Sequence, residues 1–251
     1  MKLDALAIGA HPDDVELGCG GTVARLARSG RKVGILHLTR GEAGTRGTAE
    51  ERRGEAEQAA AALGVVYLDF LDCGDGSLRD GVPEEDALIA VLRDLKPDLV
   101  LGPTPYDRHP DHGRAHRLVQ AACFYAGLAG RAPERGDPHR PAAVFSYMQH
   151  DAFEPRFVVD VTDSWEAKLA SLAAHRSQLY QPGSPPEERA EPGGASPAPV
   201  TKVSTKEFFL AVEGRARHFG LLIGATFGEP FWSPLPLAVG DPFAVLPGGV
   251  R

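Results

Sequence analysis

The chain has 251 residues, of which 43% are hydrophobic, and it carries a formal net charge of -7 at neutral pH. This length and composition fit one α/β domain with a sizeable core, and the acidic balance argues against a general nucleic-acid binder. No apolar run approaches the ~20 residues of a membrane span. Three cysteines without a Cys-x-x-Cys pair predict reduced thiols. Because the start of the chain lacks a signal peptide, we expect a cytoplasmic protein.

Strand-like and helix-like patterns alternate over the first 130 residues. We predict strands at residues 3–9, 32–39, 65–71 and 98–102, and helices at residues 18–29, 48–63, 84–95 and 113–128. The clearest helix begins with a capping box of Thr48 and Glu51 and ends before Gly64. Strands that alternate with helices form βαβ units, so we expect an α/β fold with a mostly parallel central sheet.

The pattern changes after residue 130. We predict strands at residues 142–148 and 156–161, helices at 164–179 and 204–223, and then an extended proline-rich tail. Residues 181–199 are rich in Pro, Gly, Ser and Glu, which indicates a flexible surface loop that is either an unstructured excursion or a lid over a site. Residues 1–251 are therefore expected to form a single domain, with a core at 1–130 and a C-terminal elaboration at 131–251.

Two short motifs carry the chemistry. Residues 10–14 read Ala-His-Pro-Asp-Asp after the first predicted strand, and residues 109–112 read His-Pro-Asp-His after the fourth. Because ligands bind beyond the carboxyl ends of strands in an open α/β sheet, we expect the two turns to meet. Imidazole and carboxylate groups suit a divalent metal such as zinc, and a three-ligand set leaves room for a water. The alternative is a nucleotide-binding module whose acids only cap helices, with residues 18–22 as its glycine-rich loop.

Three histidines offer ligands around the second motif. Of His109 and His112, one can bind the metal while the other faces the substrate, and Asp111 between them can hydrogen-bond an imidazole. His112 and His116 also form a His-x-x-x-His pair at the start of a helix. We favour His112 as the only ligand of that pair.

These motifs, with Glu16 and residues 18–22, resemble those of the PIG-L/LmbE-like zinc-dependent N-acetylglucosamine deacetylases. The resemblance implies an LmbE-like fold, which is a Rossmann-like three-layer sandwich. It also implies a homo-oligomer, a trimer or hexamer, that acts on a small acetylated amino sugar. Residues 106–108, 177–178, 217–220 and 228–231 are similar to the bacillithiol biosynthesis branch, which deacetylates N-acetylglucosaminyl-malate.

The resemblance also implies roles for single residues. Zinc would be held by His11, Asp14 and His112, although Fe²⁺, Co²⁺ or Mn²⁺ suit the same donors. Asp13 would be the general base, His109 would stabilise the oxyanion and protonate the amine, and Asp111 would support His109. Some relatives place a tyrosine near the oxyanion, but the late helix of this chain offers only Phe208 and Phe209.

Two arginines match positions that line the family's substrate pocket, Arg52 and Arg108. A bidentate contact from either one to a carboxylate of malate makes physical sense. The alternative for Arg52 is a solvated helix face, and Arg53 could exchange roles with it. Other functions that stay open are deacetylation of another N-acetylglucosamine conjugate or chitooligosaccharide, and a non-catalytic nucleotide- or sugar-binding module.

Overall fold

The computed structural model describes residues 1–181 and 199–241, and their strands form one seven-stranded sheet in the order β3-β2-β1-β4-β5-β7-β6. The parallel part consists of β1 (Ala5–Gly9), β2 (Val33–His37), β3 (Tyr67–Phe70), β4 (Leu99–Gly102) and β5 (Ala143–Tyr147). Beyond it lie β7 (Gly228–Trp232), antiparallel to β5, and β6 (Phe157–Asp160), antiparallel to β7. The predicted α/β class with a mostly parallel sheet is confirmed.

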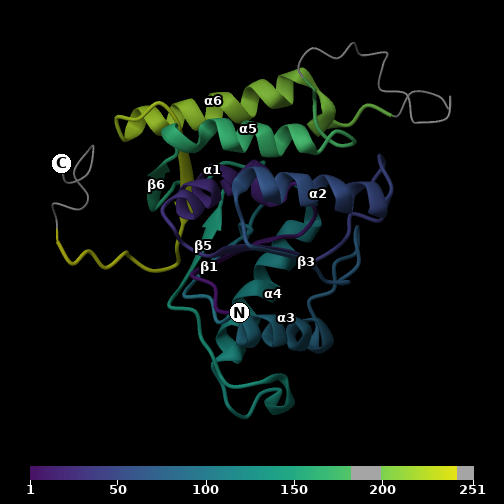
Figure 1. The fold of residues 1–251 in the computed structure, drawn as a ribbon, viewed down its shortest axis with the longest axis vertical. Coiled ribbons are helices and arrows are strands. Elements are labelled where there is room, and N and C mark those ends of the chain that lie inside the picture. The colour runs from purple at the N-terminus through teal and green to yellow at the C-terminus, as the bar shows by residue number, and fades with distance from the viewer. Residues whose placement is uncertain (182–198, 242–251) are drawn as a thin grey trace.

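Helices cover both faces of this sheet (Figure 1). One face is covered by α1 (Asp14–Arg28) and α2 (Ala49–Leu63), with α5 (Trp165–Ala174) and α6 (Lys206–Leu222) beyond them. The other face is covered by α3 (Val82–Leu95) and α4 (Pro110–Ala126). Buried aliphatic side chains fill the space on each side of the strands. Within the described ranges, none of the helices has both the length and the apolar character needed to cross a bilayer.

The capping box predicted for α2 is confirmed. The Thr48 hydroxyl accepts a hydrogen bond from the Glu51 amide at 3.1 Å, the Glu51 carboxylate accepts one from the Thr48 amide at 2.7 Å, and Gly64 ends the helix in the left-handed region with φ 75°. The two side chains thus accept hydrogen bonds from backbone amides at the start of α2, which have no partner within the helix.

Two other helices begin earlier in the chain than the sequence pattern predicts. The first helix begins at Asp14, four residues earlier than predicted, and the fourth begins at Pro110, three residues earlier. Proline at the first helical position is favourable, because its missing N–H would be unpaired there. The second motif therefore lies on the first turn of α4, whereas the first motif forms the turn that leads into α1, with only Asp14 inside the helix.

The C-terminal part departs most from the prediction. The helix expected at 164–179 ends at Ala174, and residues 228–232 form β7 inside the sheet where an extended tail was expected. Pro230 weakens the strand pattern, since proline cannot donate to a ladder. Phe231 nevertheless is fully buried and stacks on Phe157 with ring centroids 5.2 Å apart. The predicted loop at 181–199 lies almost wholly outside the described residues.

A buried ion pair between Lys168 and Glu229 hydrogen-bonds the backbone groups that a break in α1 leaves without helical partners. Cys19 departs from helical geometry with φ -143°, so the helix has two inner ends there. Glu229 of β7 accepts hydrogen bonds from the amides of Gly21 at 2.9 Å and Thr22 at 2.7 Å. Lys168 of α5 donates to the Leu17 carbonyl at 3.0 Å and to Glu229 at 2.5 Å. The pair therefore joins the C-terminal elements to the helix that carries the first motif.

We expect Glu229→Gln to lower the free energy of unfolding by about 3–5 kcal/mol, because the Lys168 ammonium stays buried without its counter-charge. Chemical denaturation monitored by circular dichroism measures this. The matched control is Glu213→Gln, which removes a more exposed pair with Arg217 on α6 and should change stability by about 0.5 kcal/mol or less. Equal changes in stability for the two variants would contradict the prediction that the buried Lys168–Glu229 pair contributes more than the exposed one.

Candidate active site

The two motifs meet at one edge of the sheet. β1 leads into the first motif and β4 into the second, and these strands are parallel neighbours in the sheet. The ring centroid of His11 lies 4.8 Å from that of His109 and 5.6 Å from that of His112. Residues about a hundred positions apart in the chain therefore form one cluster, as the strand-end argument predicts.

Asp14 lies between two of these imidazoles. Its Oδ2 atom is 3.4 Å from Nδ1 of His11, and its Oδ1 atom is 3.3 Å from Nε2 of His112. The Gln149 side-chain amide donates to the same Oδ1 atom. Burial opposes ionisation, but the His112 and His11 rings together hold the pKa of Asp14 well below its usual value. Asp14 is thus a carboxylate flanked by two ring nitrogens.

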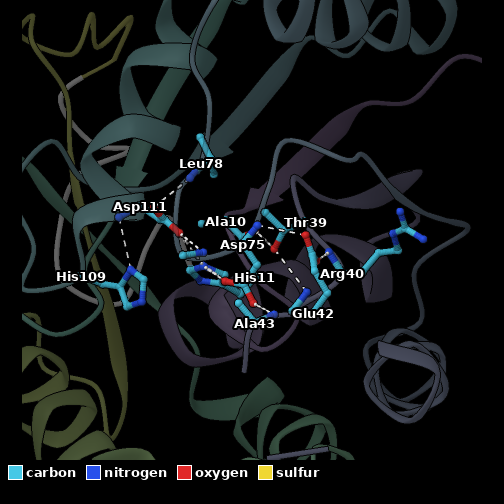
Figure 2. Close-up of polar contacts among 12 residues, drawn as sticks. Ala10, His11, Thr39, Arg40, Glu42, Ala43, Asp75, Leu78, His109 and Asp111 are labelled. Carbon is cyan, nitrogen blue, oxygen red and sulfur yellow. Dashed lines mark hydrogen bonds and ion pairs between the residues drawn. The ribbon is translucent and has the colours of Figure 1, made fainter. Parts of the chain in front are cut away.

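The other nitrogens of these rings face carboxylates. Nε2 of His11 is 3.1 Å from Asp75 Oδ1 and 3.4 Å from Asp111 Oδ2 (Figure 2). Nδ1 of His112 is 3.0 Å from Asp107 Oδ1. A carboxylate behind an imidazole fixes the ring and raises its basicity, which is the usual environment of a metal-binding histidine. The donors at this site therefore fit a divalent cation.

We expect metal affinity to rise with pH. Burial lowers the pKa of an imidazole, but Asp14 and Asp107 outweigh it and raise the pKa of His112 to about 9. Below that pH the metal-free ring is protonated, so binding through its nitrogen must displace a proton. Each displaced proton makes the apparent affinity about tenfold stronger per pH unit between about pH 6 and 8. Competition with a chelating indicator measures this, and a pH-independent affinity would contradict it.

Asp13 lies beside this group but does not join it. It precedes α1 with a left-handed backbone, φ 112°, and its side chain makes no capping hydrogen bond. Asp13 therefore occupies the N-cap position of α1 without capping the helix through its side chain. Burial is the main effect that raises the pKa of Asp13 to about 6; Asp14 adds to it and Arg52 opposes it. A buried carboxylate with a raised pKa is suited to take a proton from water near neutral pH.

The structure changes the expected partner of Asp111. Its carboxylate was expected to support His109, but it accepts hydrogen bonds from the amides of Gly76 at 2.8 Å and Leu78 at 3.1 Å and lies against His11 (Figure 2). The turn at 76–78 therefore draws the carboxylate away from His109. The His109 ring itself accepts the Asp111 amide at 3.2 Å, and burial with the neighbouring rings lowers its pKa.

The arginines predicted to line the pocket have different environments. Arg52 is only 4% exposed and donates to the carbonyls of Pro12 at 2.8 Å and Gly41 at 3.1 Å. The alternative of a solvated helix face is therefore wrong for Arg52, whereas Arg53 is exposed and pairs along its own helix. Arg108 is exposed, next to the second motif.

Sequence reasoning missed several polar residues at the site, namely Asp75, Asp107, Gln149 and His150. Asp107 accepts hydrogen bonds from the amides of His109 at 3.1 Å and His150 at 2.9 Å, so it ties the second motif to the segment after β5. Gln149 and His150 follow a strand of the parallel part of the sheet. Their position beyond a carboxyl strand end was the available signal.

Comparisons with known proteins agree with this geometry. A family model described as PIG-L, GlcNAc-PI de-N-acetylase, matches residues 6–123. The diacetylchitobiose deacetylase of Thermococcus kodakarensis is 36% identical over 193 residues, which cover 69% of each chain.

Two solved structures cover nearly the whole chain. The conserved protein TT1542 from Thermus thermophilus has a TM-score of 0.82 and 38% identity, covering 96% of this chain and 98% of its own. The N,N'-diacetylchitobiose deacetylase from Pyrococcus horikoshii has a TM-score of 0.75 and 28% identity, covering 91% and 82%.

Proposed function

Because this chain belongs to the PIG-L family of deacetylases, we propose that it removes the N-acetyl group from an N-acetylglucosamine conjugate at the site formed by its two motifs. Hydrolysis of a carbon–nitrogen bond outside peptides is the activity for which its relatives are named. The observation that carries the proposal is the Asp14 carboxylate held between His11 and His112, with Asp13 beside it and the Asp13 side chain free of a capping hydrogen bond.

We assign the metal to His11, Asp14 and His112, and we propose zinc as the ion. When bound, such an ion polarises the amide carbonyl and makes water more acidic. Asp75 and Asp107 orient the two rings from behind, and Gln149 holds the carboxylate. These contacts leave Asp13 outside the ligand set.

The remaining groups handle protons. Asp13 takes a proton from the attacking water, whose oxygen bonds to the acetyl carbon. His109, whose ring centroid lies 4.8 Å from that of His11, hydrogen-bonds the developing oxyanion, and Asp13 passes the proton that it took from water to the leaving nitrogen. The carbon–nitrogen bond then breaks, and acetate and the free amine leave. General acid–base assistance of this kind contributes about 10²–10⁴-fold to a rate.

For the substrate we propose N-acetylglucosaminyl-malate, as the resemblance to the bacillithiol branch implies. The supporting observation is that Arg108 is exposed next to the second motif, where its guanidinium is available to a carboxylate. Diacetylchitobiose is the second candidate, because two relatives, at 36% and 28% identity, are named for it.

Amine release from both conjugates and from N-acetylglucosamine, with metal-stripped and zinc-restored protein, tests the proposal. Zinc-dependent turnover that strongly favours the malate conjugate supports it in full. A preference for diacetylchitobiose keeps the deacetylase and discards malate. No metal-dependent turnover of any acetylated sugar, in protein that holds metal, overturns it.

We further expect Arg108→Gln to raise KM for the malate conjugate by about 10-fold or more, because a charge-assisted hydrogen bond is lost. KM for diacetylchitobiose, which has no carboxylate, should not change. Steady-state kinetics on both substrates measures this, with Arg53→Gln as the control. An equal loss on both substrates would remove Arg108 from carboxylate recognition.

A further inference from the structure

Asp13 has a backbone conformation that needs support. Its φ of 112° and ψ of -21° lie in the left-handed region, which residues other than glycine rarely adopt. Its carbonyl still accepts the Leu17 amide at 2.9 Å, so the residue is locked to the start of α1 on its C-terminal side. On its N-terminal side, the Pro12–Asp13 peptide lies inside a turn that the Asp14 amide closes by donating to the His11 carbonyl at 3.3 Å. The orientation of that peptide therefore decides where the Asp13 side chain points.

Arg52 holds this peptide. Its Nη2 atom donates to the Pro12 carbonyl at 2.8 Å and lies 3.9 Å from Asp13 Oδ2. Its Nη1 atom donates to the Gly41 carbonyl at 3.1 Å, which fixes the plane of the guanidinium. One buried cation therefore contacts both the backbone before Asp13 and the surroundings of its carboxylate.

The hydrogen bond opposes relaxation of the strain. A half-turn of the Pro12–Asp13 peptide changes ψ of Pro12 and φ of Asp13 together, which would return Asp13 to a negative φ. The same rotation would turn the Pro12 carbonyl away from Arg52 and break a hydrogen bond from a charged donor. Such bonds are stronger than neutral ones, so the arginine favours the strained form.

The loop at residues 41–47 packs closely against the Arg52 guanidinium. A Cβ atom at Gly41 would lie 2.1 Å from Nη1 of Arg52, and one at Gly44 would lie 2.9 Å from it. The loop is tied in turn to the segment after α5, because Arg46 donates to the Ser177 carbonyl at 2.6 Å and Gln178 donates to the Arg46 carbonyl at 2.6 Å. The guanidinium is thus enclosed by backbone.

We propose that Arg52 is a positioning residue, which holds the Pro12–Asp13 peptide in its strained conformation and thereby aims the Asp13 carboxylate. This role rests on the proposed function of Asp13 as the base. It differs from the direct substrate contact that the sequence predicted for Arg52.

Kinetics of Arg52→Gln and Arg52→Lys, with Arg53→Gln as the matched control on the same helix, test the proposal. A misplaced base should lower kcat of Arg52→Gln by about 10²-fold, with KM within about twofold of wild type and metal content unchanged. Arg52→Lys should recover part of kcat, since an ammonium can reach one carbonyl but lacks the planar fork that spans two. An increase in KM with kcat preserved would overturn the proposal, because it indicates a substrate contact.

A double variant separates positioning from a general loss of structure. If Arg52 acts through Asp13, adding Arg52→Gln to Asp13→Asn should lower the residual rate no further. A further loss, of the same size as in the wild-type background, would show that Arg52 acts independently and would overturn the proposal.

A crystal structure of Arg52→Gln provides a readout that does not depend on turnover. We expect the Pro12–Asp13 peptide to flip and Asp13 to leave the left-handed region. An unchanged Asp13 would overturn the positioning role whatever the substrate. Lack of wild-type turnover on every acetylated sugar would instead count against the proposed function alone, so the two failures are distinguishable.

Discussion

Replacing Asp13 by Asn is expected to lower kcat by about 10²–10⁴-fold while the metal content stays at the wild-type level. The amide has nearly the same shape as the carboxylate but cannot accept a proton from water. Because Asp13 lies outside the Asp14–imidazole group, replacing its carboxylate should leave the metal donors in place. Amine release, together with elemental analysis of the purified variant, measures both quantities.

The control for this variant is Asp72→Asn. Asp72 is an exposed aspartate that pairs with Arg40 at the surface, so its loss should leave both turnover and metal content unchanged. Wild-type kcat in Asp13→Asn would remove Asp13 from the role of base. Loss of metal along with turnover would place it among the ligands instead.

Replacing His112 by Ala is expected to lower metal affinity by more than about 100-fold and to abolish turnover. Loss of an outer partner of a ligand costs about 10–100-fold in affinity, and loss of the ligand itself costs more. Asp107→Asn, which removes the carboxylate 3.0 Å behind the His112 ring, should therefore fall between the wild type and His112→Ala. Chelator competition and elemental analysis of the three proteins measure this order.

His116→Ala is the matched control, because it removes the other histidine of the His-x-x-x-His pair. Nδ1 of His116 lies 3.0 Å from the Pro103 carbonyl, and its ring packs against Trp232 at 6.2 Å. The variant should bind metal as the wild type does. Metal loss from His116→Ala, or full occupancy in His112→Ala, would reverse the assignment of the ligand.

The amino-acid sequence determined where the site lies. Apolar runs followed by His-Pro-Asp motifs identified two strand ends, and parallel strands bring their carboxyl ends to one edge of the sheet. The capping box of Thr48 and Glu51 likewise determined the start of α2, because both partners are three residues apart in the chain. These features depend on local spacing or on the direction of strands, and both can be read from the chain.

Only the tertiary structure decided which groups surround the motifs. Asp75, Asp107 and Gln149 come from three separate segments, and only the fold shows that they face His11, His112 and Asp14. β7 joins the sheet because Phe231 packs against the core, although its proline weakens the strand pattern.

The environment of Arg52 was also decided by packing. On its helix it stands among glutamates and reads as solvated, yet the loop at 41–47 closes over it and directs its donors to the Pro12 and Gly41 carbonyls. Burial and side-chain direction depend on elements that are distant in sequence, and they set the pKa of Asp13 and the partner of Asp111. The sequence thus predicted the candidate reacting groups, and the fold determined their orientation and electrostatics.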